Sequence, residues 1–150
     1  RQGIQDIEPM GDDRFAEAHG AEKGAYLVRK ADRRPDVVLV GNGSEVSTLL
    51  GGADILKKQG FMVNVASAPS PNLFFDQDEA YRESVIPSNV PVFGLSAGLP
   101  DALKDIAGHK GKVIGLEHFG YSAPYSVLDE KLGYTAENVA EKVRDFLKKK

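Results

Sequence analysis

The sequence predicts an α/β domain with a doubly wound, mostly parallel or mixed sheet of about five strands and helices on both faces. Short apolar runs rich in β-branched residues recur along the chain, and segments with helical spacing of apolar residues separate them. The length of 150 residues is that of one ordinary domain. The content of 41% hydrophobic and 27% charged residues is typical of a folded soluble protein.

Residues 1–24 lack this regular alternation. They are polar, contain Pro9 and show no apolar period, so we expect an interdomain connector or the end of a preceding domain, with one helical turn near residues 12–18. The domain itself is expected to cover residues 25–150. The chain begins at Arg1 rather than at a methionine, and we therefore expect it to be part of a longer polypeptide.

Residues 25–60 predict two strands and a helix. Residues 25–29 form a short β-like run, and residues 36–40 form a compact β-branched run of the kind buried on both faces in a parallel sheet. Glycines end the second strand, and the Ser44 hydroxyl can cap the next helix. One apolar stripe at helical spacing defines the buried face of this helix: Val46, Leu49, Leu50, Ala53 and Leu56.

A glycine pair interrupts this helix. Gly51 and Gly52 each cost about 1 kcal/mol relative to alanine in a helix interior. We therefore expect another element to pack closely against the helix at these two positions. Lys57, Lys58 and Gly60 then end the helix with favourable charges and a breaker.

Residues 61–107 repeat the alternation of strand and helix. A proline-rich loop at residues 69–71 separates the first strand of this segment from a helix that Pro87 stops. The last helix of the segment places its apolar residues on one side. The predicted elements are strand 61–66, helix 78–86, strand 90–95 and helix 101–107, the last with Leu103, Ile106 and Ala107 on its buried side.

Residues 112–150 complete the predicted fold with one strand and two helices. The strand at 112–116 is followed by a turn and by a helix at 124–132 whose proline lies in the first turn, where a missing N–H costs nothing. Thr135 is placed to cap the final helix. The buried face of that helix is expected to consist of Val139, Val143, Phe146 and Leu147.

The turn of Gly41, Asn42, Gly43 and Ser44 is the first candidate site. Backbone N–H groups at the start of a helix can hold a phosphate. A dinucleotide fingerprint would also need a glycine where Val46 stands and an acid after the next strand, and both are missing. We therefore interpret the turn as structural, with a regulatory anion- or nucleotide-binding module as the alternative.

Glu117 and His118 form the second candidate, because ligands of open α/β sheets gather beyond the carboxyl ends of the strands. His118 could act as an acid or base, and Ser122 lies four residues further on. Ser122 does not stand in a Gly-x-Ser-x-Gly motif, and a histidine and a serine alone make no catalytic triad. We interpret His118 as a polar loop or interface residue.

Other classes of site find little support in the sequence. The chain has no cysteine, and His19 and His109 lack metal-ligand spacing, so no metal site is expected. Phe74 and Phe75 are expected to plug against the sheet or a neighbouring domain. The net charge of −3 gives no reason to expect nucleic acid or an anionic membrane as a partner.

The compartment expected from this composition is the cytosol or a similar reducing environment. No signal peptide is visible in the sequence. A plastid or mitochondrial precursor would have lost its transit peptide, so a location in an organelle remains an alternative.

Residues 35–150 resemble the third, carboxy-terminal domain of transketolases. The resemblance rests on four motifs in the family's order, which together cover about three quarters of the chain. Arg1 and Gln2 are also similar to an Arg-Gln pair at the end of the family's middle domain. The motifs lie at residues 36–46, 68–77, 81–87 and 115–135, and the last contains Gly-Leu-Glu-His-Phe-Gly.

The resemblance implies a homodimeric parent enzyme of the pentose phosphate pathway, a glycolaldehyde transferase. Such an enzyme moves a two-carbon ketol unit between ketose and aldose phosphates and uses thiamine diphosphate with Mg²⁺ or Ca²⁺. The family's cofactor motif is absent here, so the chain is expected to be a structural or assembly domain, inactive in isolation and partnered by the preceding thiamine-binding domains. Arg1 is expected to bind the sugar phosphate, in the intact enzyme only.

Three related alternatives remain open at this point. The chain could belong to a transketolase proper, to a dihydroxyacetone synthase or to a split two-gene enzyme. The equivalent domain of a 2-oxo acid dehydrogenase β subunit is a further alternative, although the motifs at residues 81–87 and 119–124 favour transketolase.

Overall fold

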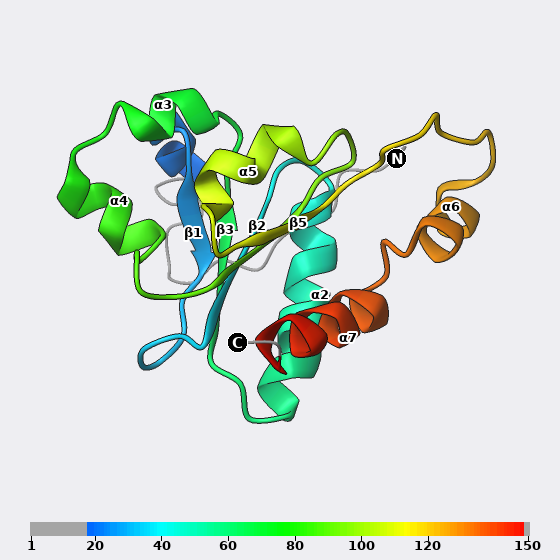
Figure 1. The fold of residues 1–150 in the computed structure, drawn as a ribbon, viewed down its shortest axis with the longest axis horizontal. Helices are drawn as coiled ribbons and strands as arrows, with labels where there is room; N and C mark the ends of the chain where they lie inside the picture. The colour runs from blue at the N-terminus through cyan, green and yellow to red at the C-terminus, as the bar shows by residue number, and fades with distance from the viewer. Residues whose placement is uncertain (1–17, 149–150) are drawn as a thin grey trace.

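A five-stranded mixed sheet forms the centre of the domain, in a computed structural model that describes residues 18–148 (Figure 1). The strand order is β1-β3-β2-β4-β5, with β2, β3, β4 and β5 parallel and β1 antiparallel at the edge. The predicted doubly wound α/β fold is confirmed. The strands are β1 (Tyr26–Arg29), β2 (Val37–Gly41), β3 (Val63–Ser67), β4 (Val92–Leu95) and β5 (Lys112–Ile114).

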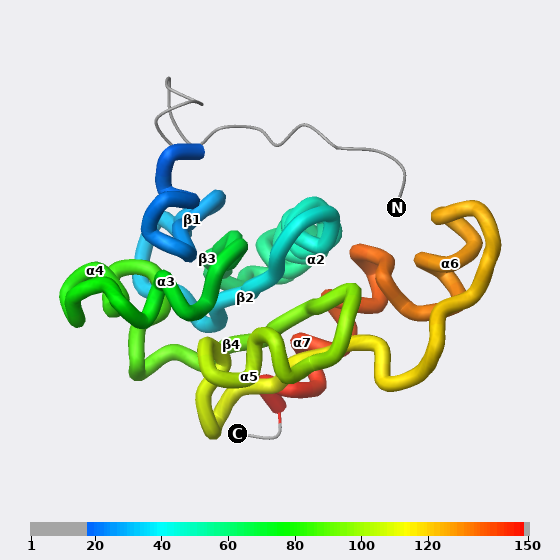
Figure 2. The backbone as a smooth tube through the Cα atoms, turned by 90° about the horizontal axis from the view of Figure 1, so that it is seen from above, coloured from blue at the N-terminus to red at the C-terminus, as the bar shows by residue number. Residues whose placement is uncertain are grey.

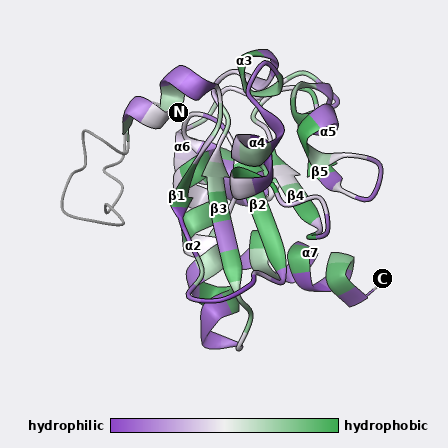
Figure 3. Cartoon of the chain, turned by 90° about the vertical axis from the view of Figure 1, so that its left-hand side faces the viewer, coloured by the Kyte–Doolittle hydropathy of each residue, from purple (hydrophilic) through white to green (hydrophobic). Residues whose placement is uncertain are grey.

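The two central strands are buried along their whole length, as the run at residues 36–40 predicts. Alternate residues of a strand point to opposite faces of a sheet. Val37 and Leu39 accordingly join one apolar core, while Val38 and Val40 join a second core on the other face. The hydropathy of the strands is visible in Figure 3. A strand that is apolar on both faces requires helices on both sides.

Helices α2 (Glu45–Lys58) and α7 (Ala136–Lys148) cover one face (Figures 1 and 2). The glycine pair explains how closely they approach. A Cβ atom added at Gly52 would lie 2.7 Å from Val139 Cγ1, and one added at Gly51 would lie 2.9 Å from Ala136 Cβ. The predicted close partner of this helix is therefore α7.

Helices α3 (Pro71–Phe75), α4 (Glu79–Val85) and α5 (Asp101–Ala107) cover the opposite face. Phe74 is 2% exposed and packs in this core, whereas Phe75 remains 39% exposed. The Tyr81 hydroxyl donates a hydrogen bond to the Ala25 carbonyl, with 2.8 Å between the oxygens. Leu103, Ile106 and Ala107 are buried, as the spacing predicts.

Two segments differ from the sequence-based expectation. Residues after the proline-rich loop form the short helix α3, because Pro71 stands at the start of a helix, where it needs no N–H partner. Within the expected connector, η1 (His19–Lys23) forms a 3₁₀ turn, and the Lys23 Nζ lies 4.3 Å from the centroid of the Tyr81 ring. The turn expected near residues 12–18 falls almost entirely outside the described residues.

The ends of the strands shift by one or two residues for identifiable reasons. Phe61 and Met62 do not enter β3, because the Phe61 N–H closes the end of α2 on the Leu56 carbonyl and the Met62 N–H is bonded to the Asp36 carboxylate. At the other end of the sheet, the Leu116 N–H bonds to the Gly98 carbonyl in a loop instead of extending β5.

The last connection of the domain leads through α6 (Tyr125–Leu132) to α7. The Thr135 hydroxyl accepts a hydrogen bond from the Asn138 N–H at 3.3 Å, so this residue caps α7 as predicted. Val139 and Val143 are buried, and Phe146 and Leu147 pack at the margin of the core. Among residues 18–148, no helix combines the length and apolar character needed to cross a membrane.

Candidate functional site

The turn after β2 lies at the carboxyl edge of the sheet, where the sequence places the first candidate site. Gly43 has a φ of +57°, which favours glycine. Gly41 is needed for a different reason, because an added Cβ would lie 2.9 Å from Leu49 Cδ1 and 3.2 Å from the Leu95 carbonyl oxygen. Tight packing and a left-handed backbone thus explain both glycines without a ligand.

Ser44 does not cap α2, so that prediction is wrong. Its backbone already has helical dihedral angles, and no hydrogen bond from its side chain caps the helix. The Ser44 hydroxyl instead donates to Glu45 Oε1 at 2.7 Å. The acidic neighbour competes for the hydroxyl, which capping rules applied to Ser44 alone do not consider.

Glu45 is buried at this edge, with 5% of its surface exposed. Its carboxylate stands at the start of α2, where a bound phosphate would meet a negative charge. Glu45 also contributes electrostatically to Tyr134, which is 6% exposed. Burial, and secondarily the charge of Glu45, raise the pKa of Tyr134 above its ordinary value of 10.0.

Tyr134 connects two parts of this edge. Its hydroxyl donates to the carbonyl of Ser96, the residue that follows β4, with 2.5 Å between the oxygens. Ser96 is itself 3% exposed, and its hydroxyl accepts from the Gly98 N–H at 3.2 Å. The polar groups of Glu45, Ser96 and Tyr134 are thus engaged with other protein groups. Sequence reasoning missed this cluster, although a tyrosine between two helices was a usable signal.

His118 lies beyond the end of β5 and is exposed. Its Nδ1 is 2.8 Å from the Phe119 carbonyl oxygen, and its ring centroid is 5.7 Å from that of Tyr121. Glu117 and Ser122 are also exposed. His118 therefore lies in a polar loop, as predicted, and its ring contacts the Phe119 carbonyl and the Tyr121 ring.

The other sequence candidates do not converge on this edge. His19 bonds to Glu22 at the start of the described chain, with 3.2 Å between Nδ1 and Oε1. His109 is exposed in the turn before β5. Within the described part of the chain, no group of three or more His, Asp or Glu residues is placed to hold a metal ion. Arg1 lies outside the described residues.

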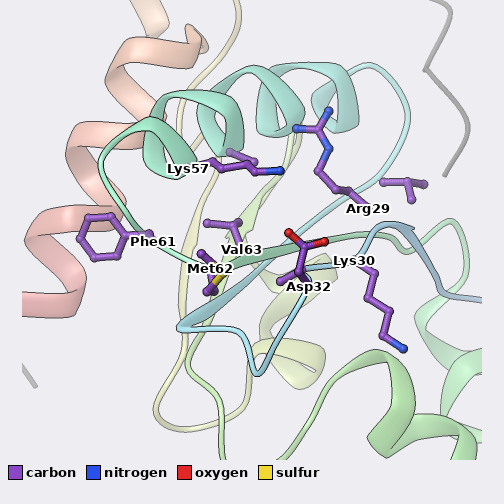
Figure 4. Close-up of a pocket in the computed structure, with 10 residues that line it drawn as sticks. Arg29, Lys30, Asp32, Lys57, Phe61, Met62 and Val63 are labelled. Atoms are coloured by element: carbon purple, nitrogen blue, oxygen red, sulfur yellow. The ribbon is translucent and has the colours of Figure 1, made fainter.

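A cavity of about 550 Å³ lies at the opposite edge of the sheet, between the end of β1, the end of α2 and the start of β3 (Figure 4). Its cations are not gathered around one point. Arg29 Nη1 donates to Asp54 Oδ1 at 2.5 Å and to the Leu50 carbonyl at 3.3 Å. Figure 4 shows the Lys30 side chain directed away from Arg29 and Lys57. This arrangement does not form a convergent anion site.

The fold defines a class: a doubly wound α/β domain whose carboxyl edge holds two internal hydrogen bonds, from Ser44 to Glu45 and from Tyr134 to Ser96. A family model described as "Transketolase-like TK C-terminal domain" matches residues 24–135. The chain belongs to this family of transketolase C-terminal domains.

Individual relatives agree with the family. The chain is 40% identical over 129 residues to Transketolase 1 of Pasteurella multocida, covering 83% of this chain and 19% of that protein. It superposes on a transketolase from Leishmania mexicana with a TM-score of 0.78 and 34% identity, covering 87% of this chain and 19% of the other. A Pichia stipitis transketolase in complex with sedoheptulose-7-phosphate gives a TM-score of 0.78 and 28% identity, covering 86% and 18%. The chain thus spans about a fifth of these relatives.

Proposed function

We propose that this chain is the C-terminal assembly domain of a transketolase and performs no chemical step itself. The parent enzyme transfers a two-carbon ketol unit from a ketose phosphate to an aldose phosphate. The observation that carries this proposal is the family match over residues 24–135. Residues 25–150 make up the domain in this proposal, and residues 1–24 connect it to the preceding one.

The proposed parent is a cytoplasmic homodimer whose preceding domains bind thiamine diphosphate and Mg²⁺ or Ca²⁺. The cofactor supplies the carbanion chemistry of ketol transfer. A sugar phosphate as substrate is supported by the Pichia stipitis relative, whose structure is described as a complex with sedoheptulose-7-phosphate. In this proposal residues 25–150 bind neither cofactor nor sugar, and Arg1, in the connector, holds the phosphate of the sugar.

The test compares the intact enzyme with the isolated chain. The polypeptide that contains this chain should transfer a two-carbon unit between a ketose phosphate and an aldose phosphate when thiamine diphosphate and Mg²⁺ are supplied. Residues 1–150 alone should give no turnover above the buffer rate under the same conditions. An intact enzyme without ketol transfer would refute the proposed parent activity, and turnover by the isolated chain would refute the assembly role.

A further inference from the structure

The segment that leaves the carboxyl edge after β5 is unusually exposed and apolar. We call residues 117–132 the α6 arm; they comprise a loop and helix α6. All residues from 117 to 127 are exposed. Four of the seven exposed large apolar side chains among residues 18–148 lie within nine consecutive positions of this arm: Phe119 (98% exposed), Tyr121, Tyr125 and Val127. Exposed apolar groups gathered in this way mark interaction surfaces.

Charge is also missing from this stretch. Residues 119–127 read Phe-Gly-Tyr-Ser-Ala-Pro-Tyr-Ser-Val and contain no acidic or basic residue, in a chain of which 27% is charged. Depletion of charge together with enrichment of aromatic residues characterises the cores of protein interfaces.

Helix α6 packs less than the other α-helices, and its contact with the core is made by the partly buried Leu132 at its end. It spans eight residues and has no buried residue, whereas α2, α3, α4, α5 and α7 each bury at least one. In both Figure 1 and Figure 2 it lies at the periphery of the domain. Isolated helices of this length are marginal in water, and most helical stability in proteins comes from packing.

The arm nevertheless has defined local contacts. Gly133 ends α6 in a left-handed conformation, and the Tyr134 N–H bonds to the Asp129 carbonyl at 2.7 Å. The Lys131 Nζ lies 3.9 Å from the centroid of the Tyr121 ring, which ties the loop to the helix. A surface organised in this way loses less conformational entropy when a partner binds.

We propose that the α6 arm docks on a preceding domain of the same transketolase polypeptide. This inference rests on the proposed function. The chain spans about a fifth of its relatives, so a longer parent offers a large surface elsewhere in the polypeptide. Both faces of the sheet are already covered by helices of this domain, which leaves the arm as its prominent uncovered apolar surface. A tethered domain also acts at an effective concentration on the order of mM, which favours it over a second copy.

Hydrogen–deuterium exchange tests the docking in the intact enzyme. Amides of residues 117–131 should exchange at least about tenfold more slowly in the intact enzyme than in residues 1–150 alone. The double substitution Phe119→Ser and Val127→Ser should restore fast exchange within the intact enzyme. Leu73→Ser is the matched control, since it removes a 39% exposed leucine from α3 on another part of the surface and should leave the arm protected.

An unprotected arm in the intact enzyme would overturn docking. Protection in residues 1–150 alone that grows with protein concentration would overturn it as well, because it would reveal a second copy as the partner. Protection that survives the double substitution would also count against it. Ketol transfer measured on the same preparation separates the two proposals. An active enzyme with an unprotected arm refutes docking alone, whereas a protected arm in an enzyme without ketol transfer refutes the parent activity alone.

Discussion

At the scale of single residues, Tyr134 links two parts of the carboxyl edge of the sheet through a hydrogen bond. Its hydroxyl satisfies the carbonyl of Ser96 just after β4, while its ring lies in the core between the sheet, α2 and α7. The deprotonated form of this hydroxyl would be buried near the Glu45 carboxylate. Burial and the Glu45 charge both favour the neutral phenol and raise the pKa of Tyr134. The contribution of this residue to stability is therefore expected to fall at alkaline pH.

Tyr134→Phe should destabilise the domain by about 1–3 kcal/mol at pH 7, because the buried Ser96 carbonyl loses its donor. Urea unfolding followed by circular dichroism measures the free energy of unfolding. Tyr121→Phe is the control, since the Tyr121 side chain is half exposed, and it should change the free energy of unfolding by no more than about 0.5 kcal/mol. Equal effects of the two substitutions would contradict the role given to the Tyr134 hydroxyl.

The Tyr134→Phe variant also tests how the contribution of Tyr134 to the free energy of unfolding changes with pH. The folded-state pKa of Tyr134 is raised, so its contribution is complete below the unfolded pKa of 10.0 and is lost as the pH rises through the folded value. The difference in free energy of unfolding between wild type and Tyr134→Phe should therefore shrink above about pH 10. A difference that stays constant or grows between pH 9 and roughly pH 11 would contradict the raised pKa.

Arg1 is the proposed substrate-binding residue, and its test belongs to the intact enzyme. A guanidinium can donate two parallel hydrogen bonds to a phosphate. Arg1→Ala should raise KM for phosphorylated sugars by an amount equivalent to about 1.5–3 kcal/mol and leave kcat nearly unchanged. Unphosphorylated substrates serve as the control and should be unaffected. Equal losses for both kinds of substrate, or none for either, would remove Arg1 from the phosphate site.

At the scale of elements, the contact between α2 and α7 depends on missing side chains. Gly51 and Gly52 weaken α2 as a helix, yet they let the α7 residues Ala136 and Val139 approach its backbone. The helix propensity lost at the two glycines is offset by the close packing of two helices over one face of the sheet.

Gly52→Ala should therefore destabilise the domain, although alanine is the better helix former. The gain in propensity is about 1 kcal/mol, whereas overpacking against the buried Val139 costs about 1–3 kcal/mol. In a Val139→Ala background the same substitution should be neutral or stabilising, because the obstructing Cγ1 is gone. Thermal unfolding of the four proteins measures this cycle. Stabilisation by Gly52→Ala in the wild-type background would show that the helices do not meet here.

At the scale of the whole molecule, cofactor binding should be a property of the parent enzyme rather than of this domain. A ligand that binds only the folded state raises the melting temperature by mass action. Thiamine diphosphate with Mg²⁺ should therefore raise the melting temperature of the intact enzyme and leave that of residues 1–150 unchanged. Mg²⁺ alone is the control for both proteins. A cofactor-dependent rise in the isolated chain would place part of the binding site within it.

Much of the fold could be predicted because its signals are local. The β-branched run at residues 36–40 predicts a strand buried on both faces, and the predicted apolar stripe of α2 is buried at every position. The glycine pair even predicts a close neighbour without identifying α7. Sequence reasoning was less successful at the candidate site, where Ser44 bonds to Glu45 instead of capping α2. Which acceptor a hydroxyl chooses depends on side-chain positions that no propensity describes.

The sequence by itself determined the alternation of strands and helices and the two-sided burial of the sheet, since both follow from the period of apolar residues along the chain. Its motifs also sufficed to identify the transketolase family. The tertiary structure alone decided that β1 pairs antiparallel with β3, that Tyr134 reaches Ser96, and that α6 has no buried residue. These features depend on contacts between residues far apart in the chain, which local periodicity does not specify.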